Sequence, residues 1–420
     1  MQINLAAFIK DTAEGREADA ILRGCVHSGS CTATYPTYQV LGDELDGPRG
    51  CIYLIKQVLQ GKPATASTQS HLDRCLTCSN CKTTCPSEGR HSRLLDIGRA
   101  VVDAQVAGPL GQRMLRAALR SMLIRTWLFN PALIAGQAVR AALPPALKAK
   151  VSRYRLAGPW PRATHTRKML VLDGCVQPGM ASRINAAAAR VLDALGVQLL
   201  VADGSRCCGA IRQYLGDQDG ALDDLRRNID AWWPHVAPAD GDGVEAIVMT
   251  ASGCGVMLKE YGVLLAHDPL YADKAARIAA LTRDLSEVLP QFEAKLAARL
   301  GAITGHRRVS YHPPCTLQQG QKITGKVESC LRLTGIDITR FADSHLCCGS
   351  AGTYSVLQPA LAYRLRDDKL AQLHGSYPDT IVSANIGCLT HLQSGTDTPV
   401  LHWIELIDDA LQAYAIPMLA

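Results

Sequence analysis

The chain has 420 residues, of which 47% are hydrophobic and 20% charged, which is typical of a globular protein of about two to four domains. Its net charge is +6, and it contains 16 cysteines. The N-terminus has no charged start followed by a long apolar stretch, so we expect no signal peptide, and no apolar run is long enough to predict a transmembrane helix. Cysteines in a reducing cytoplasm most often serve metal binding or redox chemistry, which is the first functional expectation.

Residues 1–105 show helical periodicity around two cysteine runs. The first, GCVHSGSCTATYPTY at 24–38, resembles the iron–sulfur pattern C-x2-C-x2-C-x3-C-P with two sulfurs missing. Cys25 and Cys31 occupy its first and third positions, whereas Ser28 and Tyr35 occupy the second and fourth. Two interpretations are therefore open: this stretch still binds a cluster, or it is the remnant of a cluster site.

The second run, RCLTCSNCKTTCPS at 74–87, is complete, with Cys75, Cys78, Cys81 and Cys85 at the four positions. In two-cluster ferredoxins the first three cysteines of such a run bind one cluster, and the fourth binds the other. Zinc is disfavoured, because it usually takes two separated ligand pairs. The run therefore predicts iron–sulfur ligation.

Crossed ligation leaves each predicted cluster one thiolate short. One cluster keeps Cys25, Cys31 and Cys85 and lacks a thiolate at Ser28, and the other keeps the first three cysteines of the second run and meets Tyr35. Three thiolates suffice for a [3Fe–4S] cluster, or for a [4Fe–4S] cluster with an oxygen ligand, and serine or tyrosine oxygens can bind iron. We therefore interpret the first run as a site of altered chemistry.

Three alternatives stay open for this domain. All four sulfurs of the second run could close on one cluster, which leaves Cys25 and Cys31 idle. Cys51, just after GPRG, could supply a replacement ligand, or it could be a small buried apolar residue. The last alternative is that no stable cluster forms.

The segment 106–165 is a basic helical linker or docking segment. No acidic residue lies between Asp103 and Asp173, whereas twelve Lys or Arg lie from Arg113 to Lys168. Apolar residues recur there at helical spacing: Met114, Leu115, Leu119, Met122 and Leu123. Such a segment suits an anionic membrane surface or an acidic partner, or it is a linker helix packed on a neighbouring domain. Nucleic acid is not expected, because aromatic residues are few and no binding motif occurs.

The rest of the chain is duplicated. Cys175, Cys207 and Cys208 recur as Cys315, Cys347 and Cys348 at the same spacing, and EAIVMTASGCG recurs as DTIVSANIGCL. Strand-like and helix-like runs alternate, which predicts α/β domains with parallel sheets at 166–304 and 305–420. The fold class expected is multidomain α+β and α/β, with a helical two-cluster ferredoxin domain followed by two tandem α/β domains.

Each repeat places four cysteines after its predicted strands, where ligand sites of parallel sheets gather. They are candidates for a redox pair or a further cluster: Cys175, Cys207, Cys208 and Cys254, then Cys315, Cys347, Cys348 and Cys388. We interpret Cys330 as a core residue, and His312, His345 and His391 as structural. No GxGxxG run after a strand, P-loop or Ser–His–Asp signature is visible, so no catalytic residue is assigned and an electron-passing role is favoured.

These motifs together resemble the iron–sulfur subunit of bacterial glycolate oxidase, also called glycolate dehydrogenase. The resemblance covers nearly the whole chain and includes LGDELDGPRG, HLCCGSAGTYS, TASGCG and ANIGCLTHL. Iron–sulfur subunits of lactate-utilisation systems, anaerobic glycerol-3-phosphate dehydrogenase and heterodisulfide reductase are similar at a greater distance.

The resemblance implies two [4Fe–4S] clusters in the N-terminal domain, two tandem CCG domains, and FAD-binding partner subunits that oxidise glycolate to glyoxylate. It also implies electron flow toward the membrane quinone pool, with the protein cytoplasmic and peripheral to the inner face of the cell membrane. The family's cluster ligands carry over onto six positions: Cys25, Cys31, Cys75, Cys78, Cys81 and Cys85. Alternative functions are a lactate or glycerol-3-phosphate subunit, or an assembly scaffold with impaired clusters.

The chain departs from its relatives at several positions. Ser28 and Tyr35 stand where the family has cysteine, and Gln319 stands where relatives often have histidine. In heterodisulfide reductase a further cysteine precedes the last one of each CCG domain, whereas Ala251 and Asn385 hold that place here. A thiol-redox or a structural role for the CCG cysteines therefore stays open.

Overall fold

The computed structural model describes residues 3–87, 90–144, 151–152, 155–238, 241, 243–300, 308–339 and 341–415. The chain divides into two compact units, which we describe separately. Unit 1 comprises Met1–Leu119, Tyr214–Gly216 and His345–Lys369, and unit 2 comprises Arg120–Gln213, Asp217–Ser344 and Leu370–Ala420. Unit 1 therefore combines the two N-terminal cysteine runs with a segment from the second repeat.

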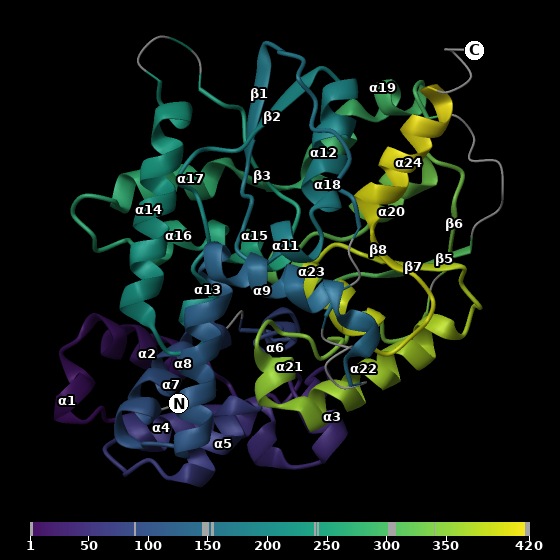
Figure 1. Cartoon of the computed structure of the whole chain (residues 1–420). Helices are drawn as coiled ribbons and strands as arrows, with labels where there is room; N and C mark the ends of the chain where they lie inside the picture. Colours follow the sequence, from purple (N-terminus) through teal and green to yellow (C-terminus); the bar gives the residue numbers. More distant parts are fainter. Residues whose placement is uncertain are drawn as a thin grey trace. The chain divides into compact units, whose positions relative to one another are not determined.

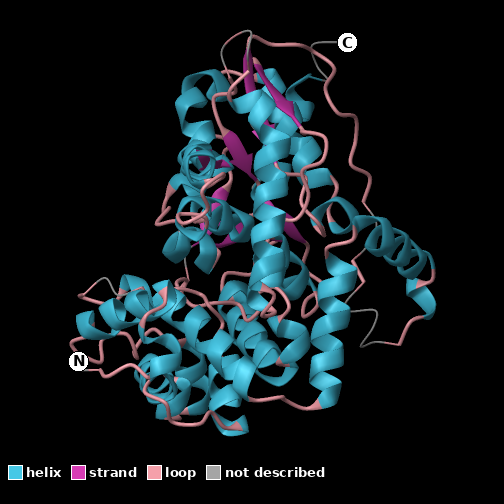
Figure 2. Ribbon diagram, turned by 90° about the vertical axis from the view of Figure 1, so that its left-hand side faces the viewer, coloured by secondary structure: helices cyan, strands magenta, loops and turns pink. Residues whose placement is uncertain are grey.

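Unit 1 is helical among its described residues, and Figure 2 draws the chain near the N-terminus as helices and loops. Its elements are α1 (Ala7–Lys10), α2 (Ala13–Gly24), α3 (Pro36–Leu41), η1 (Glu44–Asp46), α4 (Pro48–Leu59), α5 (Ala66–Asp73), α6 (Asn80–Thr83), α7 (His91–Gln105), most of α8 (Leu110–Leu123), α21 (Tyr354–Leu357) and the first part of α22 (Pro359–His374). Side-chain caps mark several helix starts, as at Thr12, whose hydroxyl accepts from the Gly15 N–H at 3.0 Å.

The core of unit 1 lies where α4 meets α7. Apolar side chains from α2, α4, α5 and α7 form one buried cluster that includes Leu22, Ile55 and Leu94. The two helices approach closely because Gly98 of α7 has no side chain, and a Cβ there would lie 2.5 Å from Cγ1 of Ile55. Cys51 of α4 belongs to this cluster, and Cys25 and Cys75 of the two cysteine runs pack against it.

The first repeat folds around a parallel sheet in unit 2 with strand order β2-β1-β3-β4. Its elements are β1 (Arg167–Val171), α11 (Gln177–Met180), α12 (Arg183–Ala194), β2 (Val197–Leu200), α13 (Ala210–Tyr214), α14 (Gln218–Val236), β3 (Ile247–Met249), α15 (Ser252–Lys259), α16 (Tyr261–Leu264), α17 (Ala272–Leu281), β4 (Thr282–Asp284), α18 (Leu285–Val288), η3 (Leu289–Phe292) and α19 (Glu293–Ala297). In Figure 1, α12 and α14 lie on opposite sides of this sheet.

The second repeat has a parallel sheet of the same topology, with order β6-β5-β7-β8. Besides α21 and α22, its elements are β5 (Arg308–His312), the π-helical turn η4 (Thr316–Gly320), α20 (Lys326–Arg332), β6 (Asp337–Thr339), β7 (Thr380–Ser383), α23 (Ile386–Gln393), β8 (Val400–His402) and α24 (Trp403–Ala415). The identical strand orders confirm the predicted duplication and the predicted fold class.

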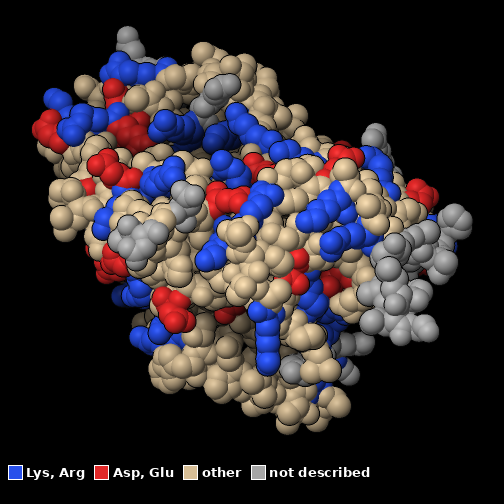
Figure 3. Space-filling model, turned by 90° about the horizontal axis from the view of Figure 1, so that it is seen from above, with Lys and Arg blue, Asp and Glu red and all other residues tan. Residues whose placement is uncertain are grey.

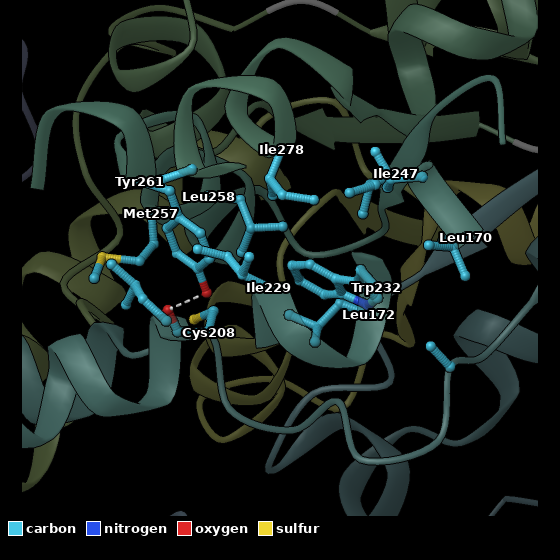
Figure 4. Close-up of a cluster of buried hydrophobic side chains, with 14 of the residues drawn as sticks. Leu170, Leu172, Cys208, Ile229, Trp232, Ile247, Met257, Leu258, Tyr261 and Ile278 are labelled. Carbon is cyan, nitrogen blue, oxygen red and sulfur yellow. Dashed lines mark hydrogen bonds between the residues drawn. The ribbon is translucent and has the colours of Figure 1, made fainter. Parts of the chain in front are cut away.

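The core of the first repeat forms between its sheet and helices α14, α15 and α17. Trp232 of α14 is fully buried and packs with Ile247 of β3 and Ile278 of α17, as Figure 4 shows. Trp232 supplies a large apolar surface to this core. The buried centre of the sheet explains why β3 and the end of β1 are continuous apolar runs, whereas the edge strands β2 and β4 alternate in burial.

The two repeats contact each other within unit 2. Helix α12 packs against α24, where the Arg190 guanidinium donates to both carboxylate oxygens of buried Asp408 at 2.9 and 2.6 Å. The loops after β3 and β7 also meet, because the Ser252 N–H donates to the Ala384 carbonyl at 3.1 Å. Acidic and basic side chains are interspersed on the face shown in Figure 3.

The basic segment forms helices α8, α9 (Thr126–Ala138) and η2 (Arg140–Ala142) in the residues that are described. Both longer helices expose large apolar side chains, including Met114 at 64% on α8 and Trp127 at 68% on α9. Among the described residues, no helix combines the length and the hydropathy needed to cross a membrane.

Candidate iron–sulfur centre

The second cysteine run forms a tight loop that turns its sulfurs inward. Thr77 and Ser79 adopt left-handed backbone angles, with φ of 51° and 63°. These conformations are uncommon for residues with side chains, and they reverse the chain between successive cysteines. Cys78 and Cys81 are buried, and the Thr77 N–H donates to the Cys75 sulfur at 3.4 Å.

The first cysteine run has left-handed residues at the equivalent places. His27 has φ of 55° and Gly29 has φ of 79°, and they correspond to Thr77 and Ser79 when Cys25 is matched with Cys75. The backbone of the first run therefore keeps the bends of the complete run. Its second position differs in its surroundings, because Ser28 is exposed, whereas Cys78 is 4% exposed.

The thiols of the two runs assemble in a crossed pattern. Cys31 lies close enough to Cys85 and Cys25 that, after burial, their charges raise the pKa of its thiol. We call Cys25, Cys31 and Cys85 the first thiol group. The second thiol group consists of Cys75, Cys78 and Cys81, whose mutual repulsion adds to the effect of burial in raising the pKa of Cys78.

Tyr35 belongs to the second thiol group. Its ring is 4% exposed and packs in one buried cluster with Cys31 and Cys81. Burial, followed by the nearby Cys51 and Cys75, raises the pKa of the Tyr35 phenol well above its usual value. The structure therefore puts Tyr35 beside the second thiol group, where crossed ligation would require a fourth ligand, although the assignment of ligands stays a prediction.

The two runs are joined by polar contacts at equivalent positions. Thr34 precedes Tyr35 and Thr84 precedes Cys85, and their hydroxyl oxygens lie 3.1 Å apart. The buried Asn80 amide donates to the Thr34 carbonyl at 3.1 Å. These bonds hold the end of each run against the other, which is the arrangement that crossed ligation needs.

Cys51 lies on α4 and is 6% exposed. Its sulfur is 3.9 Å from the Tyr35 hydroxyl oxygen, and burial together with the charge of Cys75 raises the pKa of the Cys51 thiol to about 12. Cys51 also contributes to the raised pKa of Cys81, after burial and two nearer thiols. Cys51 is part of the buried apolar cluster of unit 1, and it also lies beside Tyr35, so both alternatives for Cys51 stay predictions.

One segment of the second repeat packs on the second thiol group within unit 1. The Asn80 amide donates to the His345 carbonyl at 3.1 Å, and the Tyr354 hydroxyl donates to the Arg74 carbonyl at 3.0 Å. Cys347 is close enough to Cys78 that it ranks after burial among the causes of the raised pKa of that thiol. Sequence reasoning missed this contact, since nothing in the spacing of the cysteines signals it.

The donor sets suit iron–sulfur clusters. The first thiol group gathers sulfurs from both runs and the second gathers three sulfurs from one run, and thiolates are the ligands such clusters require. An arginine accompanies each group: Arg49 lowers the pKa of Cys31 and Arg99 lowers that of Cys51, although burial dominates both shifts in the opposite direction. Buried thiols that repel one another gain a partner for their charge when they bind metal, so the residues fit the group.

The four cysteines of the first repeat also come together. Hydrogen bonds from Cys175 and Cys208 hold the pKa of the Cys207 thiol well below its usual value, and backbone N–H groups contribute. Cys254 hydrogen-bonds with Cys208, whose pKa is raised first by its bond with Cys207. The four thiols therefore form a chain in which Cys207 contacts Cys175 and Cys208, and Cys208 contacts Cys254. This arrangement permits thiol redox chemistry or metal binding.

The loop that carries the adjacent Cys207 and Cys208 is held by hydrogen bonds to the backbone carbonyls of both residues. The Asn228 amide donates to the Cys207 carbonyl at 2.7 Å, and the Tyr261 hydroxyl donates to the Cys208 carbonyl at 3.0 Å, the bond dashed in Figure 4. Gly209 follows with φ of 93°, and a Cβ there would lie 2.6 Å from Leu225. Only glycine fits both constraints, which explains the third letter of CCG.

The cysteines of the second repeat follow the corresponding strands. Cys315, Cys347, Cys348 and Cys388 are all buried. Within unit 2, a ring nitrogen of His312 lies within 4.8 Å of the Cys388 sulfur. The Asn385 amide donates to that sulfur at 3.6 Å, Gln319 lies in η4, and His391 is buried in α23. Cys330 is 2% exposed on α20, so its predicted core position is confirmed.

Comparison with known proteins agrees with these observations. The family model "4Fe-4S dicluster domain" matches residues 24–89, and the model "Cysteine-rich domain" matches residues 169–259 and 309–393. The chain is 49% identical over 413 residues to the glycolate oxidase iron-sulfur subunit of Escherichia coli strain K12, which covers 98% of this chain and 100% of that protein.

Two more distant relatives match with lower identity. A probable glycolate oxidase iron-sulfur subunit of Bacillus subtilis strain 168 is 25% identical, covering 93% of this chain and 92% of that protein. Lactate utilization protein A of Bacillus licheniformis is 26% identical and covers 54% of this chain and 90% of that protein. The chain therefore belongs to the family of glycolate oxidase iron–sulfur subunits, with a 4Fe-4S dicluster domain and two tandem cysteine-rich domains.

Proposed function

We propose that the chain is the electron-transfer subunit of a complex that oxidises glycolate to glyoxylate. In this proposal FAD-binding partner subunits carry out the oxidation, and the chain passes their electrons toward quinone. The observation that carries the proposal is the pair of thiol groups, which are neighbours because Cys31 of the first group packs in one buried cluster with Cys81 of the second. Closely spaced centres are what a relay needs.

An iron–sulfur cluster, when bound, accepts and releases electrons at a potential set by its ligands and surroundings. The chain's own residues bury the sulfurs, supply Arg49 and Arg99 as nearby positive charge, and keep the two loops together through Thr34 and Thr84. The exposed Ser28 leaves the first thiol group with three sulfurs, which favours a [3Fe–4S] cluster or a [4Fe–4S] cluster with an oxygen ligand.

The electrostatic interaction of Cys347 with Cys78, together with the bond from Asn80 to the His345 carbonyl, supports a route from the second thiol group into the second cysteine-rich domain. Tyr354 lies near both cysteines, because its hydroxyl donates to the Arg74 carbonyl next to Cys75, and Cys75 and then Cys347 follow burial among the causes that raise the pKa of its phenol. An electron that leaves the second group would therefore meet a further cysteine of the same unit.

The test is the iron and acid-labile sulfide content of the anaerobically purified protein, with EPR spectra of its oxidised and dithionite-reduced forms. We expect stoichiometric iron and signals from two interacting centres. Iron-free protein that still supports glycolate oxidation in the complex would overturn the relay and favour the assembly scaffold. Reduction of quinone with lactate or glycerol-3-phosphate, but not glycolate, would show that the partner differs.

The basic segment is proposed as the surface that meets the inner face of the membrane. Helix α8 exposes Met114 and Arg113, and α9 exposes Trp127 and Ile134 just after exposed Arg125. Exposed apolar side chains beside arginines, in a stretch without acidic residues, suit an anionic lipid surface, because each Lys or Arg near such a surface contributes about 1 kcal/mol.

Sedimentation with lipid vesicles tests this surface. We expect the protein to bind vesicles that contain phosphatidylglycerol, to bind phosphatidylcholine vesicles less, and to lose binding at high salt. The double variant Arg113→Glu with Arg125→Glu should bind several-fold less, whereas Arg364→Glu, at an exposed position on α22, should bind normally. Equal loss in both variants would contradict a role for this segment.

A further inference from the structure

Tyr35 and Cys51 meet at the second thiol group, and only one of them has the ligand chemistry of a conventional cluster. Their terminal atoms, the hydroxyl oxygen and the sulfur, lie 3.9 Å apart. Both side chains are buried, at 4% and 6% exposure. The position that lacks a cysteine in the sequence motif therefore has a cysteine beside it in space.

The position of Cys51 is determined by the backbone of α4. The helix begins at Pro48, and the Cys51 N–H donates to the Gly47 carbonyl at 3.0 Å in its first turn. Gly50 allows this turn to press against η1, since a Cβ at Gly50 would lie 2.1 Å from the Glu44 carbonyl oxygen. The first turn of α4 therefore fixes the place of Cys51.

Cys51 lies near thiols of the second group. The Cys51 thiol interacts electrostatically with those of Cys75 and Cys81, and Cys78 interacts with both of these. Cys51 therefore joins a connected set of four thiols, and Cys75 packs against the buried cluster that contains Cys51. Four cysteine thiolates are the ordinary ligand set of a [4Fe–4S] cluster.

Thiol and phenol differ as ligands. An ordinary thiol loses its proton near pH 8.5 and a phenol near pH 10, so a thiolate is formed more readily, and its sulfur is the softer donor. A tyrosine hydroxyl that keeps its proton can instead donate a hydrogen bond to sulfur, and the Tyr35 hydroxyl is placed to do so toward Cys51.

We propose that Cys51 is the fourth thiolate ligand of the cluster held by Cys75, Cys78 and Cys81, and that Tyr35 donates a hydrogen bond to a ligand sulfur instead of binding iron. The proton of each ligand thiol leaves for solvent as its sulfur binds iron. The two centres then differ in kind: the second is a four-thiolate [4Fe–4S] site, and the first is a three-thiolate site open at Ser28. This inference rests on the proposed iron–sulfur function.

Single variants of the anaerobically purified full-length chain separate the candidate ligands. Cys51→Ala should lose the reduced [4Fe–4S] EPR signal or convert it to an oxidised [3Fe–4S] signal, and its iron content should fall. Tyr35→Phe should keep the iron content and the cluster type. Cys330→Ala, at a cysteine that is buried on α20 outside both thiol groups, is the matched control and should resemble the parent protein.

A rescue variant distinguishes the loss of a ligand from a folding defect in Cys51→Ala. Tyr35→Cys in the Cys51→Ala background returns a thiolate to the motif position, and it should restore the [4Fe–4S] signal. Circular dichroism should show that Cys51→Ala keeps its helices. A misfolded single variant whose iron is nevertheless restored by the rescue would still support ligation, because removal of the buried Tyr35 ring does not by itself repair a fold, whereas the new thiol supplies a ligand.

Several results would overturn the inference while leaving the relay intact. Unchanged iron and spectra in Cys51→Ala, with loss in Tyr35→Phe, would assign the ligand to the phenol. Loss in Cys347→Ala with no change in Cys51→Ala would assign it to the second repeat, whose Cys347 lies near Cys78. A parent protein without iron or acid-labile sulfide would instead contradict the proposed function itself.

Discussion

The hydroxyl groups of Thr34 and Thr84 lie 3.1 Å apart and join the two cysteine runs one residue before Tyr35 and Cys85. Thr84 also donates to the Asn80 carbonyl at 3.0 Å, so Thr34 is the donor in the bond between the two threonines. A half-buried bond of this kind is worth about 1 kcal/mol. Because it fixes the crossing point of the two loops, its loss should weaken cluster retention as well as stability.

We therefore expect Thr34→Val to lower the free energy of unfolding by about 1 kcal/mol and to shorten the half-life of the bound clusters in the presence of an iron chelator. The loss of visible absorbance over time measures the second effect. Thr83→Val is the control, because Thr83 donates to the Asn80 carbonyl within the same turn. Equal half-lives for the Thr34 and Thr83 variants would show that the bond between the runs does not retain the clusters.

Ser28→Cys should complete the first thiol group. His27 and Gly29 already have the left-handed backbone angles found at Thr77 and Ser79, so a cysteine at 28 enters a loop with the bends of the complete run. We expect a gain of about one iron atom per chain, with a [3Fe–4S] signal replaced by a [4Fe–4S] signal. Ser30→Cys adds an equally exposed thiol outside the ligand spacing. A similar gain in that control would mean that the iron is bound adventitiously.

Much of the architecture could be predicted from local patterns. The recurrence of CCG and of the strand-like runs indicated two duplicated α/β domains, and the two sheets have the same strand order. The cysteine spacing indicated the dicluster domain that the family comparison supports. Both depend on short-range patterns that repeat in the sequence.

The surroundings of the second thiol group could not be predicted in the same way. Cys51 reaches it because α4 packs on α7 through Gly98, and Cys347 reaches it because a segment far along the chain joins unit 1. These are tertiary contacts between residues without a shared motif. The cysteine spacing therefore showed that the motif lacks a cysteine at Tyr35. It could not show which nearby residue is best placed to replace that ligand.

Arg99 should tune the potential of the second centre. Its guanidinium donates to the carbonyls of Leu72 at 2.6 Å and Cys75 at 2.9 Å, so its positive charge is held beside the thiols. Positive charge favours the reduced, more negative cluster, so Arg99→Gln should lower the reduction potential by tens of millivolts, on the order of one nearby charge in a protein interior. EPR-monitored redox titration measures the shift.

Two further variants test whether a shift in Arg99→Gln comes from the charge of Arg99 itself. Arg99→Lys keeps the charge and should keep most of the potential, although it destabilises the fold because lysine cannot bind both carbonyls in the same way. Arg93→Gln removes a charge from the same helix, where Arg93 donates to Glu17 at 2.9 Å. A shift as large in Arg93→Gln as in Arg99→Gln would imply a long-range effect of net charge.

Acid should destabilise unit 2 through His402. This histidine is fully buried, its Nε2 lies 2.9 Å from the Thr250 carbonyl oxygen, and burial lowers its pKa from 6.5 to about 3. Above pH 6.5 neither state is protonated there, so His402 makes no pH-dependent contribution. Between pH 6.5 and about 3 the unfolded chain binds a proton that the folded chain does not, so stability falls by about 1.4 kcal/mol per pH unit.

The variant His402→Gln should therefore be less stable than the parent protein at pH 7.5, but its stability should fall less on acidification. Its deficit in Tm against the parent protein should shrink from pH 7.5 to 5.5. His267→Gln, at an exposed position, is the control. A deficit for His402→Gln that stays constant with pH would show that its imidazole takes up a proton within the folded protein.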